Sequence, residues 1–101
     1  MNILSSIFKR PSSKTIDFNE IKENGAIVVD VRTPGEYKTG HVKASYNFPL
    51  STLRKNIKIL QSFHKPLLLV CRSGNRSETA KNILKEYGIE CYNAGPWKNL
   101  N

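Results

Sequence analysis

Residues 66–87 read PLLLVCRSGNRSETAKNILKEY, and this stretch predicts a strand, a polar loop and a helix in immediate succession. The apolar run 67–70 follows a proline, which is typical of a short strand buried on both faces. After the loop, apolar residues recur at helical spacing, at Ala80, Ile83, Leu84 and Tyr87. We therefore expect Cys71 to lie where a central strand stops and a helix begins.

The loop between this strand and this helix has the composition of an anion-binding site. Its six residues, 71–76, include a glycine, two arginines and small polar side chains, so several backbone N–H groups have no partner within a strand or helix. A helix N-terminus and nearby guanidinium groups lower the pKa of a cysteine thiol, which is usually about 8.5. We interpret Cys71 as a thiolate nucleophile. A small buried cysteine beside an ordinary basic loop is the alternative reading of the same residues.

The chain of 101 residues has the length of one domain and needs no disulfide to fold. It contains two cysteines, Cys71 and Cys91, fewer than a disulfide scaffold of this length usually has. Cys91 falls in an alternating stretch, 89–92, which predicts a strand residue facing the core. We expect both to be free thiols in a reducing compartment, which indicates a cytoplasmic location.

The N-terminal residues differ from the rest in composition. Residues 1–13 are rich in serine and show no clear periodicity, so we expect a flexible lead followed by a single domain over residues 14–101. Residues 1–10 contain no long apolar segment and no cleavage site of small residues. We therefore expect neither secretion nor a membrane span.

The chain is basic, with 16 Lys and Arg against 8 Asp and Glu, a formal net charge of +8. These residues are spread from Lys9 to Lys98, without the interleaved aromatic residues that stack nucleic-acid bases. We expect a solvated basic surface and no nucleic-acid binding. The charge favours small anionic substrates or an acidic protein partner.

The remaining sequence predicts short strands that alternate with helices. We expect strands at residues 15–16, 26–31, 46–49 and 89–93, a turn at 94–97, and helices that begin after Asp17 or Asn19, after Thr33 and after Ser51. Thr33 and Glu36 have the capping-box spacing, with a proline at the first helical position. This alternation favours an α/β layer fold with a largely parallel sheet. Ligands bind beyond the carboxyl ends of such strands, where Cys71 and residues 30–32 fall.

Five segments in order closely resemble the single-domain rhodaneses, a family of thiosulfate sulfurtransferases. They are DVRTPGEY at 30–37, GHV at 40–42, ASYNFP at 44–49, CRSGNRSETA at 71–80 and GPW at 95–97. The likeness covers nearly all of residues 14–101. It implies a rhodanese-like three-layer α/β fold, in which a central, mostly parallel five-stranded sheet is flanked by helices.

The resemblance also implies a sulfur-transfer reaction, with Cys71 as the catalytic residue. Its thiolate would take the outer sulfur of a small anionic donor such as thiosulfate, become a persulfide and pass the sulfur to cyanide, a thiol or a protein acceptor. The loop N–H groups would stabilise the thiolate and the persulfide. No metal ion or organic cofactor is required. The substrate-binding residues implied are Arg72, Ser73, Gly74, Asn75 and Arg76, of which Arg76 would also tie the loop to its rim.

The first of the resembling segments has a structural role in our interpretation. Asp30, Arg32, Glu36 and His41 match the family there, and we expect them to support the site structurally. A partly buried Arg32 needs a carboxylate, which Glu36, one helix turn further on, can supply. His41 is not needed as a general base, because the loop already favours the thiolate.

Two other functions are compatible with the cysteine loop. A persulfide carrier or binding module for a specific protein partner would use the same loop, so the sequence separates it poorly from an enzyme. A phosphatase or arsenate reductase is less favoured, because relatives of that kind have five residues between Cys and Arg. Here Arg72–Asn75 makes four, and the narrower loop suits a single sulfur atom.

Overall fold

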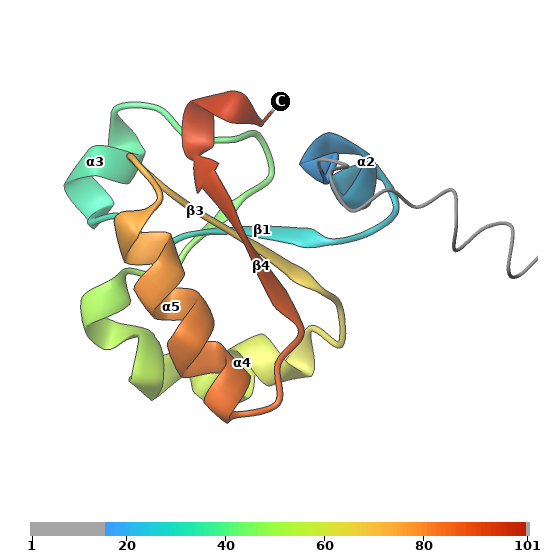
Figure 1. The fold of residues 1–101 in the computed structure, drawn as a ribbon. Helices are drawn as coiled ribbons and strands as arrows, with labels where there is room; N and C mark the ends of the chain where they lie inside the picture. Colours follow the sequence, from blue (N-terminus) through green and yellow to red (C-terminus); the bar gives the residue numbers. More distant parts are fainter. Residues whose placement is uncertain (1–15, 101) are drawn as a thin grey trace, which may run out of the picture.

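The computed structural model describes residues 16–100, so the expected flexible lead at 1–13 lies outside the described residues. Within this range four strands form one sheet in the order β2-β1-β3-β4, of which Figure 1 labels β1, β3 and β4. All neighbouring strands are parallel, so their carboxyl ends lie at one edge of the sheet. The strands are β1 (Ile27–Asp30), β2 (Tyr46–Asn47), β3 (Leu67–Cys71) and β4 (Cys91–Pro96).

The expected α/β class with a parallel sheet is confirmed, but the expectation of five strands is wrong for the described residues. The fifth strand was predicted at residues 15–16. Thr15 lies outside the described residues, and Ile16 belongs to no strand and is 52% exposed. Ile16 directly precedes Asp17, the N-cap residue of α2, so the chain there leads into a helix and does not pair with the sheet.

Helices cover both faces of the sheet, which gives three layers (Figure 1). One face packs against the 3₁₀ helix η1 (Leu50–Asn56), α4 (Ile57–Ser62) and α5 (Asn75–Glu86). The other packs against α2 (Phe18–Glu23) and the 3₁₀ helix η2 (Trp97–Asn99). Side chains of β3 alternate between the two cores, and every residue of this strand is buried, as the apolar run predicts.

Two helix starts follow the predicted capping residues. Asp17 caps α2 by accepting a hydrogen bond from the backbone N–H of Glu20 at 3.2 Å. Thr33 and Glu36 form the predicted capping box at the start of α3 (Pro34–Lys38). The predicted start at Ser51 is wrong, because the extended backbone of Pro49 leads into η1 and α4 begins only at Ile57, without a side-chain cap.

The last strand is longer than predicted. The turn expected at residues 94–97 is wrong, since β4 continues to Pro96 and pairs with the end of β3, Val70 with Gly95 and Cys71 with Pro96. The register shifts between Leu69 and Val70, so that Ala94 is an extra, unpaired residue on β4. The extension of β4 brings the C-terminal segment beside Cys71.

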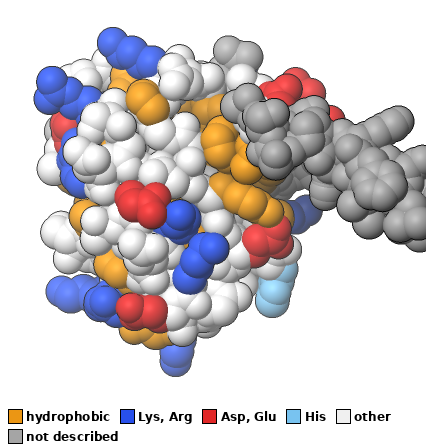
Figure 2. Space-filling view, in the orientation of Figure 1, with side chains coloured by type: hydrophobic (Ala, Val, Ile, Leu, Met, Phe, Trp, Pro, Cys, Tyr) orange, Lys and Arg blue, Asp and Glu red, His pale blue; other side chains and the backbone are white. Residues whose placement is uncertain are grey.

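The surface of the molecule is basic without one dominant patch on the face in view. Figure 2 shows Lys and Arg side chains at several separate places, with Asp and Glu between them. Between residues 16 and 100, no helix combines the length and the hydropathy of a membrane span.

Candidate active site

Cys71 ends the interior strand β3 and precedes the tight loop that leads into α5. Gly74 occupies the position before α5 with φ +104°, a left-handed conformation that suits glycine. A side chain there would also stand 3.6 Å from the Cα of Gly95 on the neighbouring strand. The chain therefore turns sharply around the sulfur of Cys71, which is only 1% exposed.

Three hydrogen-bonding groups of the loop and of the first turn of α5 surround the sulfur. The backbone N–H of Gly74 donates to Cys71 Sγ at 3.0 Å and that of Ser77 at 3.4 Å. The hydroxyl oxygen of Ser77 lies 3.4 Å from the same atom. Burial raises the pKa of the Cys71 thiol, but the hydroxyl of Ser77 and the N–H groups of Ser77, Gly74 and Ser73 lower it by more, so the net pKa is below its usual value. The site favours an anionic sulfur.

The other predicted loop residues divide into exposed and paired side chains. Arg72, Ser73 and Asn75 are exposed, and Arg72 forms no hydrogen bond or ion pair with any residue in the range 16–100. Arg76 instead donates two hydrogen bonds to the carboxylate of Glu36, from Nη1 at 2.7 Å and from Nη2 at 2.9 Å. The predicted tie between the loop and its rim is therefore present at Arg76.

Glu36 connects this loop to α3. Besides its ion pair with Arg76, it accepts hydrogen bonds from the N–H and the hydroxyl of Thr33. The bonds from Arg76 and then from Thr33 lower the pKa of the Glu36 carboxyl to about 2. The expectation that Glu36 pairs with Arg32 is wrong, because the Glu36 carboxylate binds Arg76 and Thr33 instead.

Arg32 pairs with Asp30 instead, two residues earlier in the chain. Its Nη2 lies 2.7 Å from Asp30 Oδ2 and also donates to the carbonyl of Gly40 at 2.7 Å, and both side chains of the pair are buried. The guanidinium lies over the Trp97 ring, 4.6 Å from its centre. A Cβ at Gly40 would stand 3.0 Å from that same ring. Asp30 and Arg32 therefore join β1, the following loop and η2.

The described contacts of His41 are with Tyr37 of α3. Its ring stacks on Tyr37 with centroids 3.7 Å apart, and its Nδ1 donates to the Tyr37 carbonyl at 2.7 Å. These contacts connect the loop after α3 back to that helix. They leave no described contact between His41 and the loop around Cys71.

Two residues around the sulfur were absent from the candidate site, Ser77 and Asn93. Ser77 is fully buried in the first turn of α5, and Asn93 lies on β4. The Asn93 amide bridges the loop and α5, since its Nδ2 donates to the carbonyl of Gly74 at 3.1 Å and to Glu78 at 3.0 Å. One feature of the sequence points to this role, since Asn93 is a polar residue within a strand that was predicted to belong to the core. The contact between Ser77 and Asn93 joins residues 16 positions apart, so no local pattern in the sequence could predict it.

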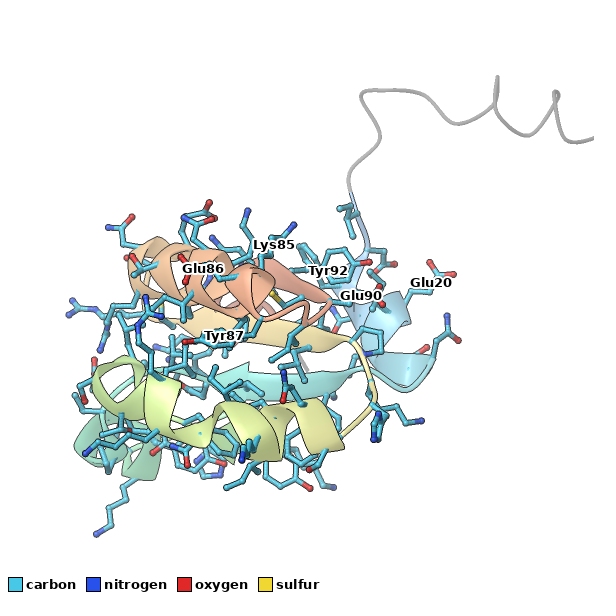
Figure 3. The ribbon with its side chains drawn as sticks, turned by 90° about the horizontal axis from the view of Figure 1, so that it is seen from below. Glu20, Lys85, Glu86, Tyr87, Glu90 and Tyr92 are labelled. Carbon is cyan, nitrogen blue, oxygen red and sulfur yellow. The ribbon has the colours of Figure 1, made fainter. Side chains whose placement is uncertain are left out.

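The second cysteine belongs to the core. Cys91 is a free, buried thiol, and burial raises its pKa, although Lys85 and Lys81 lower it in part. A surface cavity of about 270 Å³ lies near the amino ends of β3 and β4, lined by residues that include Tyr87 and Glu90 (Figure 3). It is at the opposite end of these strands from Cys71. Between residues 16 and 100, no three His, Cys, Asp or Glu side chains are grouped to hold a metal ion.

A second cavity, of about 240 Å³, lies at the same end of the sheet as Cys71. It lies between the residues that follow β1, the start of η1 and the cysteine loop. Its lining residues are Val31, Thr33, Pro49, Leu50, Ser51 and Arg76. Most of these side chains are apolar or small. The cavity is therefore a recess beside the cysteine loop.

Fold and site together define a parallel α/β protein with one buried cysteine held by the loop between a strand and a helix. Residues 16–95 match the Rhodanese-like domain, and the chain belongs to the rhodanese family. The resemblance of the sequence segments to single-domain rhodaneses is thereby confirmed.

Individual relatives agree with this assignment. The thiosulfate sulfurtransferase GlpE of Ectopseudomonas mendocina is 34% identical over 84 residues, which are 83% of this chain and 74% of that protein. A mitochondrial protein of Schizosaccharomyces pombe is 33% identical over 80 residues, and this chain spans only 56% of its length. Among solved structures, a rhodanese with anions from E. coli is 30% identical with a TM-score of 0.66, over 74% of this chain and 91% of that one.

Proposed function

We propose that the protein is a thiosulfate sulfurtransferase that carries a sulfane sulfur as a persulfide on Cys71. The observation on which this rests is the set of donors around Cys71 Sγ, with the N–H of Gly74 at 3.0 Å and that of Ser77 at 3.4 Å. These groups favour the thiolate, which is the nucleophilic form of cysteine. The relative named as a thiosulfate sulfurtransferase supports this chemistry.

The reaction has two half-reactions in this scheme. The Cys71 thiolate attacks the outer sulfur of thiosulfate, a new S–S bond forms, and sulfite leaves with the electron pair of the bond that breaks. Cyanide or a thiolate then attacks the outer sulfur of the persulfide and returns an electron pair to Sγ. With cyanide the product is thiocyanate. Neither half-reaction requires a metal ion or an organic cofactor.

The loop side chains have different roles in the proposal. Arg72, Ser73 and Asn75 are exposed at the loop, and Arg72, which has no ion-pair partner among residues 16–100, offers a positive charge for the anionic donor. Arg76 is engaged with Glu36 through both terminal nitrogens, so we assign it the tasks of holding the loop and adding positive charge. The burial of Cys71 requires a donor that reaches the sulfur with one terminal atom.

Intact-mass spectrometry tests the covalent intermediate. Incubation with thiosulfate should add one sulfur atom to the protein, and cyanide should remove it with formation of one thiocyanate. Cys71→Ser should gain no sulfur, whereas Cys91→Ser should gain one and lose it like the unsubstituted protein. The proposal fails if the unsubstituted protein gains no sulfur, or if the adduct remains in Cys71→Ser.

Turnover separates the enzyme from a persulfide carrier. Steady thiocyanate formation at modest thiosulfate supports the enzyme. Complete persulfide formation with negligible turnover on cyanide and small thiols would support a carrier that delivers its sulfur to a protein acceptor.

A further inference from the structure

The hydroxyl of Ser77 has more potential partners than hydrogens. Its oxygen lies 2.6 Å from Asn93 Oδ1, 3.2 Å from the carbonyl oxygen of Gly74 and 3.4 Å from Cys71 Sγ. A serine hydroxyl carries one hydrogen and can donate to one of these acceptors at a time. Because Ser77 is fully buried, water does not supply an alternative partner.

The orientation of the Asn93 amide follows from its other contacts. Its Nδ2 faces two groups that can only accept, the carbonyl of Gly74 at 3.1 Å and the carboxylate of Glu78 at 3.0 Å. Its Oδ1 faces a group that can only donate, the backbone N–H of Gly95 at 2.9 Å. The amide therefore presents its oxygen to Ser77, and a flipped amide would break three hydrogen bonds.

This orientation determines where the hydroxyl hydrogen lies in the resting structure. Asn93 Oδ1 has no hydrogen, so Ser77 must be the donor in the 2.6 Å contact. The hydroxyl then turns its oxygen lone pairs toward Cys71. This suits a neutral thiol, whose S–H can donate to Ser77 Oγ. A thiolate needs the opposite arrangement, with the hydroxyl hydrogen directed at the sulfur.

We propose that the Ser77 hydroxyl switches its hydrogen between two acceptors, Asn93 Oδ1 when Cys71 is a thiol and Cys71 Sγ when the sulfur is anionic. On ionisation the thiol proton leaves to solvent, and the hydroxyl rotates to donate to the sulfur. Asn93 is then a positioning residue that competes with the sulfur for this one hydrogen. The inference deepens the proposed function, since it concerns the same nucleophile, but it does not depend on the identity of the sulfur donor.

Most charged groups around the network are paired, and the exception, Arg72 next to Cys71, is exposed. Arg76 at the start of α5 binds Glu36 of α3, Arg32 binds Asp30 at the end of β1, and Glu78 binds Lys81 and Asn93. Replacing Ser77 by alanine removes no charge and touches none of these pairs. Replacing Asn93 also frees Glu78 and the Gly74 carbonyl, so its total effect includes a change in loop support.

A double-mutant cycle on the pKa of Cys71 separates competition from loop support. The four proteins are the unsubstituted chain, Ser77→Ala, Asn93→Ala and the double variant. The pKa is measured from the pH dependence of alkylation by iodoacetamide, with peptide mass spectrometry to distinguish Cys71 from Cys91. Ser77→Ala should raise the pKa, because the thiolate loses a donor. Ser77→Thr, which keeps the hydroxyl, should restore it toward the original value.

The decisive quantity is the effect of Asn93→Ala with and without the hydroxyl. Loop support is lost equally in both backgrounds, whereas the hydrogen is released to the sulfur only where Ser77 is present. The pKa change caused by Asn93→Ala should therefore be more negative in the chain that keeps Ser77 than in the Ser77→Ala variant, by about half a pH unit or more. An equal pKa change in the two backgrounds, or a less negative change in the chain that keeps Ser77, would overturn the inference.

Two further measures keep the test conclusive. Circular dichroism checks that each variant is folded, and Asn93→Leu, which is similar in volume and has no carbonyl, replaces Asn93→Ala in the same cycle if the alanine variant unfolds. The alkylation readout is independent of sulfur transfer. A protein that shows the coupling but forms no persulfide would support the switch and contradict the proposed function. A protein that forms the persulfide but shows no coupling would support the proposed function and contradict the switch.

Discussion

Glu36 and Arg76 stand 40 positions apart in the chain and meet in a two-bonded ion pair, with N–O distances of 2.7 and 2.9 Å. The same carboxylate accepts hydrogen bonds from Thr33 at the start of α3. One side chain therefore caps a helix and holds the loop that surrounds Cys71. Because donors stabilise an anion only when they are fixed in direction, this pair is part of the support of the site.

The first prediction concerns the pH dependence of stability at Glu36. Its pKa is lowered to about 2 in the folded protein, from 4.5 without these contacts. The carboxylate therefore stabilises the fold above about pH 4.5, and this contribution is lost as the pH falls from 4.5 toward 2. Glu36→Gln should lower the melting temperature at about pH 7, and the difference from the unsubstituted protein should shrink toward about pH 3.

Glu86→Gln is the matched control for this measurement. Glu86 also pairs with an arginine, Arg54, but at 3.4 Å and with both side chains more than half exposed. Exposed pairs of this kind contribute little. At the same neutral pH, Glu86→Gln should change the melting temperature by less than about half of the change caused by Glu36→Gln. Equal effects of the two substitutions would contradict a special role for the Glu36 pair.

The second prediction separates the two arginines of the loop by kinetics. Arg72→Ala should raise KM for thiosulfate about 1.4- to fivefold with kcat nearly unchanged, as expected for an exposed charge worth about 0.2–1 kcal/mol of binding. Arg76→Ala should lower kcat and the melting temperature, because the loop loses its tie to Glu36. Steady-state thiocyanate formation gives both constants.

Lys65→Ala is the control for a general effect of charge, because Lys65 is exposed and precedes β3, at the opposite end of the strand from Cys71. Its KM should match that of the unsubstituted protein. A KM for Lys65→Ala that rises as far as that of Arg72→Ala would show that only the net charge matters.

The third prediction concerns the width of the loop. Inserting a glycine between Gly74 and Asn75 should lower sulfur transfer more than about tenfold, because Gly74 and Ser77 could no longer both donate to the sulfur at 3.0 and 3.4 Å. Loss of one such donor to a developing anion costs about 2.7–4 kcal/mol. The measurement is thiocyanate formation, with circular dichroism as the check on folding.

The insertion also tests the less favoured phosphatase reading. The variant has five residues between Cys71 and the arginine, so hydrolysis of an aryl phosphate should be assayed in parallel. Full sulfur transfer by a folded insertion variant would mean that loop length does not determine the reaction, and the phosphatase would have to be considered again.

The fourth prediction concerns the second cysteine. Cys91→Ser should keep most of the activity, because Cys91 lies in the core and has no described contact with the loop. Placing a hydroxyl in this buried position should lower the free energy of unfolding by at most about 1–3 kcal/mol. Denaturant unfolding and thiocyanate formation give the two values. A well-folded but inactive variant would indicate a relay between two cysteines.

Local patterns in the sequence predicted the elements that depend on neighbouring residues. The buried strand β3, the capping box at Thr33 and the position of Cys71 before a helix all follow from residues within a few positions of each other. The partner of Glu36 does not follow from nearby residues, because the choice between Arg32 and Arg76 depends on how α3 lies against the loop. The extension of β4 and the role of Asn93 depend on pairing with β3 across the sheet.

The all-parallel sheet has a consequence for folding kinetics. Among the described strands none pairs with another across a short turn: Val29 pairs with Tyr46, Leu67 with Cys91 and Ile27 with Leu67, so each of these pairings closes a long stretch of chain. Such non-local contacts slow folding relative to helical proteins of similar length. The edge strand β4, which contains Asn93, has β3 as its one neighbour among the described strands. The environment of Cys71 is therefore complete only once β4 has paired with β3.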